Sequence, residues 1–352
     1  MMTSDLVSII VPAYGHEPYV LDCLQSLYAQ THERLELIFI DDRSHDRTYD
    51  LAQALLATRF ASRFENVVLK RKAENSGAHD SLNMGLELAK GDYIAIVNSD
   101  DLFRPQRVER LLAAMKEKGS EFSFSIVETL DDGMAEGDGD GEGVATSLVP
   151  ENLLLLSLRQ RLAIARDVSV GFALLRQNVG ISTGNFLFSS RIAGKVGNFL
   201  PLKYCHDWDF ILQALLHTEP VAVLEPLYDY RLHQQNSFRA YQNIAEIETE
   251  VVLRRFFRSV LSVRATNRLC PSPENWPGYF EAFVQEAGYG VFWTKEAGNS
   301  LPGWRTYDQS GKRHLNAPFR PGEVVSAEAA FRRLAEGAFI SREKEKNIIL
   351  EL

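Results

Sequence analysis

The chain has 352 residues, a length that can bury a large core and that fits a main domain with an extension. Its 47 Asp and Glu outnumber its 38 Lys and Arg, so the formal net charge is −9 and no nucleic-acid partner is expected. The three cysteines, Cys23, Cys205 and Cys270, are too widely spaced for a disulfide framework or a zinc site.

Strand and helix patterns alternate along the first hundred residues. Short apolar runs predict buried strands at 6–11, 35–40, 67–69 and 93–97. Apolar residues at helical spacing predict helices at 19–30, 47–58 and 79–89 between them. Strands joined through helices by short connections form parallel crossover units, so we expect a doubly wound α/β fold.

Paired acids follow two of these strands. Asp41-Asp42 comes after the strand at 35–40, and the sequence Asn-Ser-Asp-Asp at 98–101 comes after the strand at 93–97. Neighbouring carboxylates repel each other, and a divalent metal carrying a phosphate is the obvious group to relieve that repulsion. Open α/β sheets bind ligands at this end of their strands. Aspartate also caps helices at such positions, so the acids by themselves fit a ligand site and a structural role equally well.

Six short motifs then match one enzyme family in order and spacing. They are Val11-Pro12-Ala13-Tyr14, Gln30-Thr31, Ile40-Asp41-Asp42-Arg43-Ser44, Asn75-Ser76-Gly77, Gly91-Asp92-Tyr93-Ile94 and Asn98-Ser99-Asp100-Asp101. The match continues at Thr183-Gly184-Asn185, His206-Asp207-Trp208-Asp209 and Tyr230-Arg231-Leu232-His233. Over roughly its first 235 residues the chain resembles the family 2 glycosyltransferases of the GT-A fold.

The resemblance implies a fold and a function. The fold is a GT-A type doubly wound, mostly parallel sheet flanked by helices. The function is that of an inverting glycosyltransferase, which moves a sugar from a nucleotide-diphosphate sugar to a glycan or lipid-linked acceptor, most simply in the synthesis of a bacterial surface polysaccharide. The alternative is a nucleotide-sugar-binding or scaffold protein without turnover. The acids at 100, 101 and 207 favour the enzyme, whereas Asn98 and Leu82, which replace a family Asp and Arg, keep the alternative open.

A divalent cation, Mn²⁺ or Mg²⁺, is implied because charge builds on the departing diphosphate. The resemblance assigns Asp101 to the metal and Asp100 to the ribose or to a position behind the metal. It also places His233 at the metal or the diphosphate, where neutral imidazole suits Mn²⁺. Arg231 is a weaker candidate for a phosphate contact.

The nucleotide is expected against the ends of the first two strands. The nucleotide-sugar-binding positions implied by the resemblance are Pro12, Ala13, Tyr14, Glu17, Asp42, Asn75, Gly77, Asn98 and Asp100. Asp42 would accept hydrogen bonds from the base or the ribose. Glu17 matches an acidic family position beside the base, but in the first turn of a helix it serves equally well as a cap partner. Gly77 permits the backbone to approach the nucleotide closely.

Glycosyl transfer also needs a base that takes the proton from the acceptor hydroxyl. Asp207 aligns with the acidic base of the family, and it would otherwise be the cap of a helix at 207–216. Trp208 is expected to pack beside it, on the donor and acceptor side. Gly184 and Asn185 match family positions beside the donor sugar and acceptor, and a turn that feeds an edge strand explains them equally well.

We expect a GT-A domain at 1–240 and a helical extension at 241–352. The GT-A domain would comprise a nucleotide-binding half at 1–128, an acidic Gly-rich surface loop at 131–143 and an acceptor half at 150–240. The loop imitates the start of a calcium site but lacks the closing Glu, so we do not expect calcium there. The segment at 276–320 shows no clear periodicity.

The extension contains an amphipathic pattern at 249–269, with arginines gathered on one side between Arg254 and Arg268. Such a helix either lies on an anionic membrane that presents a lipid-linked acceptor or, as the plainer alternative, packs on the catalytic domain. No apolar run approaches 18 residues and no signal-peptide pattern opens the chain, so we expect a cytoplasmic protein, with peripheral membrane contact as a hypothesis. No pattern indicates an oligomeric state.

Overall fold

The computed structural model describes residues 5–131, 155–233 and 242–297. An eight-stranded sheet with the order β3-β2-β1-β4-β7-β6-β8-β5 forms its centre. The strands are β1 (Val7–Ala13), β2 (Leu35–Asp41), β3 (Asn66–Arg71), β4 (Tyr93–Ile96), β5 (Leu102–Phe103), β6 (Phe122–Asp131), β7 (Leu187–Ser189) and β8 (Val221–Leu232). β3, β2, β1 and β4 run parallel, β7 is antiparallel to β4 and β6, and β8 is parallel to β6 and antiparallel to β5.

The predicted elements of the first hundred residues are all present. The four predicted strands are β1 to β4, and the three predicted helices are α1 (Val20–Tyr28), α2 (Thr48–Leu56) and α3 (Ala78–Leu88). The remaining helices before residue 220 are α4 (Arg107–Lys118), α6 (Leu156–Arg166), α7 (Val170–Arg176), α8 (Ser190–Val196) and α9 (His206–Ala214), with short 3₁₀ turns η1 (Arg59–Arg63) and η2 (Thr183–Asn185). The mostly parallel sheet with flanking helices confirms the predicted fold class.

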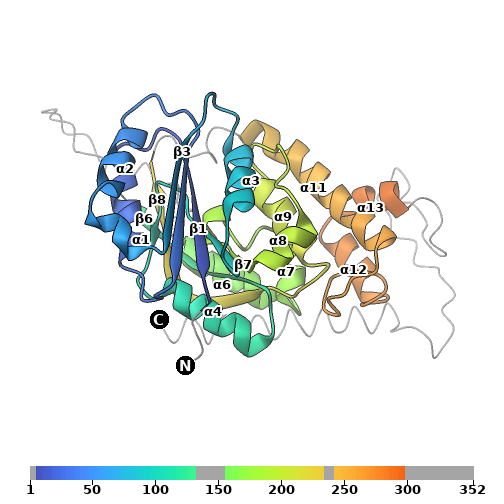
Figure 1. Ribbon diagram of the computed structural model, residues 1–352. Helices are drawn as coiled ribbons and strands as arrows, with labels where there is room; N and C mark the ends of the chain where they lie inside the picture. Colours follow the sequence, from blue (N-terminus) through green and yellow to red (C-terminus); the bar gives the residue numbers. More distant parts are fainter. Residues whose placement is uncertain (1–4, 132–154, 234–241, 298–352) are drawn as a thin grey trace, which may run out of the picture.

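Helices cover both faces of the sheet, because its central strands are apolar on both sides (Figure 1). Val7, Ile9 and Val11 of β1 point into a core shared with α1, α2 and α4. Ile10, between them, points into the opposite core with α3 and α9. This alternation follows from the two-residue period of a strand. Both cores are therefore specified by the same short apolar runs.

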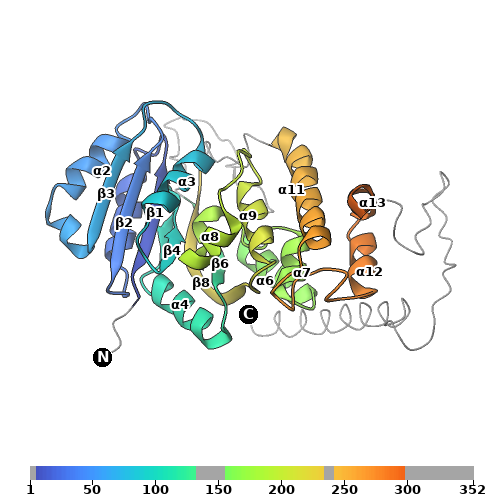
Figure 2. The ribbon, with the colours of Figure 1, turned by 45° about the vertical axis from the view of Figure 1, so that its right-hand side comes forward.

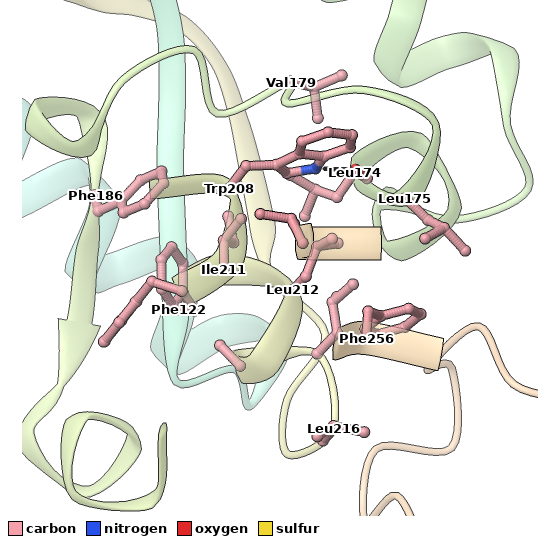
Figure 3. Packing of buried hydrophobic residues seen from close by; sticks show 14 of the residues in the cluster. Phe122, Leu174, Leu175, Val179, Phe186, Trp208, Ile211, Leu212, Leu216 and Phe256 are labelled. Carbon is pink, nitrogen blue, oxygen red and sulfur yellow. Dashed lines mark hydrogen bonds between the residues drawn. The ribbon is translucent and has the colours of Figure 1, made fainter. Parts of the chain in front are cut away.

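The C-terminal part of the described chain is helical, with α11 (Gln242–Ser262), α12 (Tyr279–Glu286) and α13 (Gly290–Ala297). α11 lies against α9 in both views (Figures 1 and 2). Phe256 of α11 and Leu212 and Leu216 of the α9 region belong to one buried cluster (Figure 3). The helices after residue 241 thus share the core that supports the sheet.

One expectation for this region was wrong. The amphipathic pattern at 249–269 does not form one helix, because α11 ends at Ser262 and the backbone N–H groups of Thr266 and Asn267 donate to the carbonyl of Leu216 (2.8 and 3.2 Å). The segment after 276 has no clear periodicity in its sequence, yet it contains α12 and α13, in agreement with the predicted helical extension. These helices are short and bury aromatic rings such as Phe280 and Trp293, so an apolar repeat hardly develops.

Some expectations fall outside the described residues. Apart from Asp131, the acidic loop at 131–143 lies there, as does everything after residue 297. Within the described part of the chain, no helix combines the length and the apolar character needed to cross a bilayer.

Candidate active site

Asp100, His16 and His233 meet at the carboxyl edge of the sheet. Nε2 of His233 lies 2.9 Å from Oδ2 of Asp100, and Nε2 of His16 lies 3.6 Å from the same oxygen. Each residue offers one ligand atom, and these atoms lie within 4.8 Å of one another. Oδ1 of Asp100 is buried without a hydrogen-bond partner among the described residues. Two imidazoles and a carboxylate with a free oxygen suit a divalent transition metal.

His16 is held in place by hydroxyl groups. Its Nδ1 lies 2.7 Å from Oγ of Ser99, and its backbone N–H donates to Oγ1 of Thr48 (2.8 Å). The preceding Gly15 has φ = +70°, a conformation that glycine adopts without strain. Burial lowers the pKa of His16, which favours the neutral imidazole that binds metals. Sequence reasoning missed His16, since a single histidine after a strand carries no motif.

Asp101 points away from the imidazoles. Its carboxylate accepts hydrogen bonds from the Tyr228 hydroxyl (2.6 Å), the backbone N–H of Arg231 (2.8 Å) and Nδ2 of Asn98 (3.0 Å). Burial, with the charge of Asp100 next, raises its pKa. Asp100 thus joins His16 and His233 in the cluster, whereas Asp101 connects β8 to the end of β4 through these hydrogen bonds. The role of Asp101 as a metal ligand stays a prediction.

Arg231 adds a further contact between the end of β8 and the acid pair. Its Nε donates to the backbone carbonyl of Asp100 (2.8 Å), and its guanidinium lies 4.9 Å from the ring centre of Tyr19. The side chain is buried. Arg231 therefore orients the turn that carries Asp100, and a direct phosphate contact stays a prediction.

Asp42 organises the loop before α3. Its two oxygens accept from the backbone N–H groups of Ser76 (3.0 Å) and Gly77 (2.8 Å), and Nζ of Lys72 lies 2.7 Å away. Gly77 has φ = +92°, which explains the need for glycine. Asn75 is exposed beside this loop. The contact between Asp42 and a base or ribose stays a prediction, and it would compete with these bonds.

A cavity of about 310 Å³ opens at the end of β3, beside the loop that Asp42 holds. Its lining residues are Lys70, Arg71, Lys72, Ala73, Glu74, Ser76 and Met84. Around the end of β1, Tyr14 is exposed, while Ala13 is buried and Pro12 half-buried. Glu17, which lies before α1, accepts from the backbone N–H of Arg47 (2.9 Å) at the start of α2, and its contact with a base stays a prediction.

Asp207 lies in the first turn of α9 and is nearly covered. Oδ2 accepts from Nδ2 of Asn178 (2.8 Å), and Oδ1 accepts from the backbone N–H of Trp208 (2.7 Å). Burial raises the pKa of Asp207 to about 7. A carboxylate that titrates near neutrality is well matched to proton transfer at physiological pH. The role of Asp207 as the base stays a prediction.

The phenol of Tyr230, in β8, is shielded from solvent. Burial raises its pKa, and the charges of Asp101, Asp100 and Asp207 raise it further. Tyr230 is therefore neutral near pH 7.

Two predicted donor or acceptor residues use their polar groups within the protein. Nε1 of Trp208 donates to the carbonyl of Leu174 (2.6 Å; Figure 3). Asn185 is fully buried, and its amide bonds to the backbone of Ser125 and Gly180. We assign Trp208 and Asn185 positioning roles, and their direct contact with a sugar stays a prediction.

Gly184 is required by close packing. A Cβ atom built on it would lie 2.0 Å from the Tyr228 hydroxyl and 3.0 Å from the backbone N of Asn98. Gly184→Ala should therefore displace Tyr228 from Asp101 and lower the free energy of unfolding by about 1–3 kcal/mol, as overpacking does. Urea denaturation measures this change. Gly194→Ala is the matched control, because its Cβ meets nothing within 4 Å; equal effects of the two substitutions would contradict the packing argument.

The chain is similar to known glycosyltransferases. Residues 8–136 match the family model described as glycosyl transferase family 2. GlyG of Streptococcus pneumoniae, a glycosyltransferase, is 32% identical over 118 residues, which are 34% of this chain and 38% of that protein. TuaG of Bacillus subtilis, assigned to teichuronic acid biosynthesis as a glycosyltransferase, is 38% identical over 120 residues, 34% of this chain and 46% of TuaG. These matches thus span less than half of either relative.

One relative and two solved structures are similar to this chain over most of its length. EpsH of Bacillus subtilis, assigned as a glycosyltransferase, is 25% identical over 343 residues, 94% of this chain and 86% of EpsH. The S. aureus TarS 1-349 complex with UDP-GlcNAc is similar with a TM-score of 0.55 and 18% identity, covering 82% of this chain and 73% of that one. The mannosyltransferase PcManGT from Pyrobaculum calidifontis, in complex with GDP-Man and Mn²⁺, has a TM-score of 0.51 and 16% identity, covering 86% and 78%. Both structures show the shared fold.

Proposed function

We propose that the chain, whose residues 8–136 match the model of glycosyl transferase family 2, is an inverting glycosyltransferase of that family. Its donor would be a nucleotide-diphosphate sugar and its acceptor a glycan or lipid-linked glycan of a bacterial surface polysaccharide. The observation that supports this most is the cluster of Asp100, His16 and His233 at the carboxyl edge of the sheet, in a chain whose residues 8–136 match the family 2 model. The donor class is that bound by TarS and PcManGT, and the acceptor class follows the assignment of TuaG.

Asp100, His16 and His233 are the residues that would hold a divalent cation. The fit rests on the free, buried Oδ1 of Asp100 and on the neutral imidazole of His16. A bound Mn²⁺ or Mg²⁺ would offset the negative charge that develops on the departing diphosphate. Asp101 and Arg231 keep Asp100 in position through the end of β8.

Asp207 would take the proton from the acceptor hydroxyl as that oxygen attacks the anomeric carbon. The bond from the anomeric carbon to the diphosphate breaks as the new glycosidic bond forms, and the proton goes to the carboxylate of Asp207. A single displacement of this kind needs one base and no protein nucleophile, and it inverts the anomeric configuration. Asn178 and the backbone of Trp208 hold the carboxylate in a fixed orientation.

The pH dependence of glycosyl transfer should reveal the pKa of Asp207, the proposed base. Since only ionised Asp207 accepts a proton, we expect kcat/KM to fall below an apparent pKa near 7 and to reach a plateau above it. Asn178→Ala removes a hydrogen bond that favours the ionised form of Asp207. It should therefore move the acidic limb of the pH–rate profile, where kcat/KM falls, to higher pH. A pH–rate profile of both proteins measures the shift. A limb that stays in place in the variant would contradict the assignment.

A donor panel tests the proposed function, including the alternative of a binding protein without turnover. Unfolding temperatures would be measured with UDP-, GDP- and dTDP-sugars, each with and without Mn²⁺, and release of the nucleoside diphosphate would be followed in parallel. A donor at about 100 times its dissociation constant stabilises the protein by about 2.7 kcal/mol. Metal-dependent stabilisation with release supports the enzyme. Stabilisation without release supports the alternative, and no stabilisation by any donor would reject both.

A further inference from the structure

The turn before α9 is held by a carboxylate from α11. Oε1 of Glu248 accepts from the backbone N–H of Lys203 (2.8 Å), and Oε2 accepts from those of Tyr204 (2.8 Å) and Cys205 (2.9 Å). Three successive amides thus donate to one nearly buried carboxylate. Cys205 is the N-cap residue of α9 and makes no side-chain cap bond, so Glu248 supplies the negative group that favours this helix end.

The same face of α11 contacts α9 further along. Arg255, seven residues after Glu248, forms an ion pair with Asp209. Oγ of Ser259 donates to Oε1 of Gln213 (2.9 Å). Between these polar ties, Val252 and Phe256 are fully buried in the shared core. The register of α11 on α9 is therefore set at several points, and Glu248 is the contact that holds the turn before Asp207.

We propose that Glu248 is a positioning residue for Asp207. On this proposal α11 contributes to catalysis and does more than pack against the domain. This inference rests on the proposed role of Asp207 as the base. The turn at 203–205 leads directly into the first turn of α9, where Asp207 is the second helical residue. If the three amides lose their acceptor, the turn becomes less ordered, and the carboxylate of Asp207 is no longer held in the position that proton transfer requires. A displacement of about 1 Å in a reacting group costs up to roughly 100-fold in rate.

Glu248 also acts on Asp207 through its charge. Titratable groups that interact with Asp207 are Tyr204 and Cys205 of the preceding turn, Tyr230 of β8 and Glu248 of α11. Burial raises the pKa of both phenols and of the thiol, so these groups are neutral near pH 7. Burial is the largest cause of the raised pKa of Asp207, and the carboxylate of Glu248 raises it further. Removing this charge should make Asp207 more acidic.

Three variants test the proposal. Glu248→Ala removes every acceptor, Glu248→Gln keeps one acceptor oxygen and removes the charge, and Glu246→Gln is the matched control at an exposed position of the same helix. We expect Glu248→Ala to lower kcat by about 10- to 100-fold with the donor KM changed less than about twofold. Glu248→Gln should shift the acidic limb of the pH–rate profile to lower pH. Glu246→Gln should change neither.

Hydrogen exchange of the amides of 203–205 gives a readout that does not depend on turnover. Their protection should fall in Glu248→Ala and persist in Glu246→Gln. Unchanged protection, an unshifted limb in Glu248→Gln, or a loss of donor affinity as large as the loss of kcat would overturn the positioning role. A wild-type protein without transfer would instead reject the proposed function, whereas an active wild type with an equally active Glu248→Ala would reject this inference alone.

Discussion

Asp207→Asn is expected to lower glycosyl transfer by about 10²- to 10⁴-fold and to leave donor binding unchanged. The amide keeps the size of the carboxylate and can still bond to Asn178, but it cannot take a proton. Transfer would be followed as release of the nucleoside diphosphate, and donor binding as the thermal shift with Mn²⁺. A matched loss of donor affinity would make Asp207 a binding residue instead of the base.

The same substitution should stabilise the protein at neutral and alkaline pH. The folded-state pKa of Asp207, about 7, lies above the ordinary value of 3.8, so the folded protein holds this proton more tightly than the unfolded chain. The stability gained from the protonated carboxyl is fully present below about pH 4 and is lost as the pH rises to 7. A pKa difference of that size corresponds to at most about 4 kcal/mol.

Asn has no such dependence on pH. The unfolding free energy of Asp207→Asn should therefore match that of the wild type at pH 4 and exceed it by up to a few kcal/mol at pH 8. Urea denaturation at the two pH values measures the difference. A variant that is less stable than the wild type at pH 8 would contradict the buried, weakly acidic carboxyl on which the catalytic assignment depends.

Asp100→Ala should abolish the Mn²⁺-dependent part of donor binding while the fold is kept. Asp100 is the member of the acid pair whose carboxylate faces His16 and His233 and retains a free oxygen. Asp101→Ala is the matched comparison at the neighbouring position. It leaves the Tyr228 hydroxyl and the N–H of Arg231 without their acceptor, so we expect a loss of stability of about 1–3 kcal/mol.

The two variants should therefore lose different properties: Asp100→Ala loses metal binding, and Asp101→Ala loses stability. Calorimetric titration with Mn²⁺ should show no binding to Asp100→Ala, and urea denaturation should show that Asp101→Ala is the less stable of the two. The reverse pattern, with metal binding lost only in Asp101→Ala, would restore Asp101 as the ligand and reject the orientation seen here.

Local patterns predicted the first hundred residues of the fold well. Its strands are continuous apolar runs, such as Leu35–Asp41, and crossover helices separate them, so each element carries its own signal. The acid pairs at strand ends were also recognisable. Which acid of the pair joins the histidines was not, because Tyr228, Arg231 and His233, which distinguish Asp101 from Asp100, come from more than 120 residues away.

The C-terminal helices were less predictable for a related reason. The arginines at 254 and 258 suggested a basic face for a membrane, yet both donate to Glu296 of α13. Arg255 pairs with Asp209 in the same way. Such pairing depends on tertiary contacts that no local pattern encodes. Membrane contact stays a prediction, and co-sedimentation with anionic liposomes at low salt would test it.

The anomeric configuration of the sugar released from an α-linked UDP-, GDP- or dTDP-sugar tests the central claim most directly. In the slow reaction with water as the acceptor, proton NMR distinguishes the first-formed β-sugar from the α-sugar before the two interconvert. The proposed single displacement by a hydroxyl that Asp207 deprotonates predicts the β-sugar as the initial product, in the wild type and not in Asp207→Asn. An initial α-sugar would contradict the inverting mechanism.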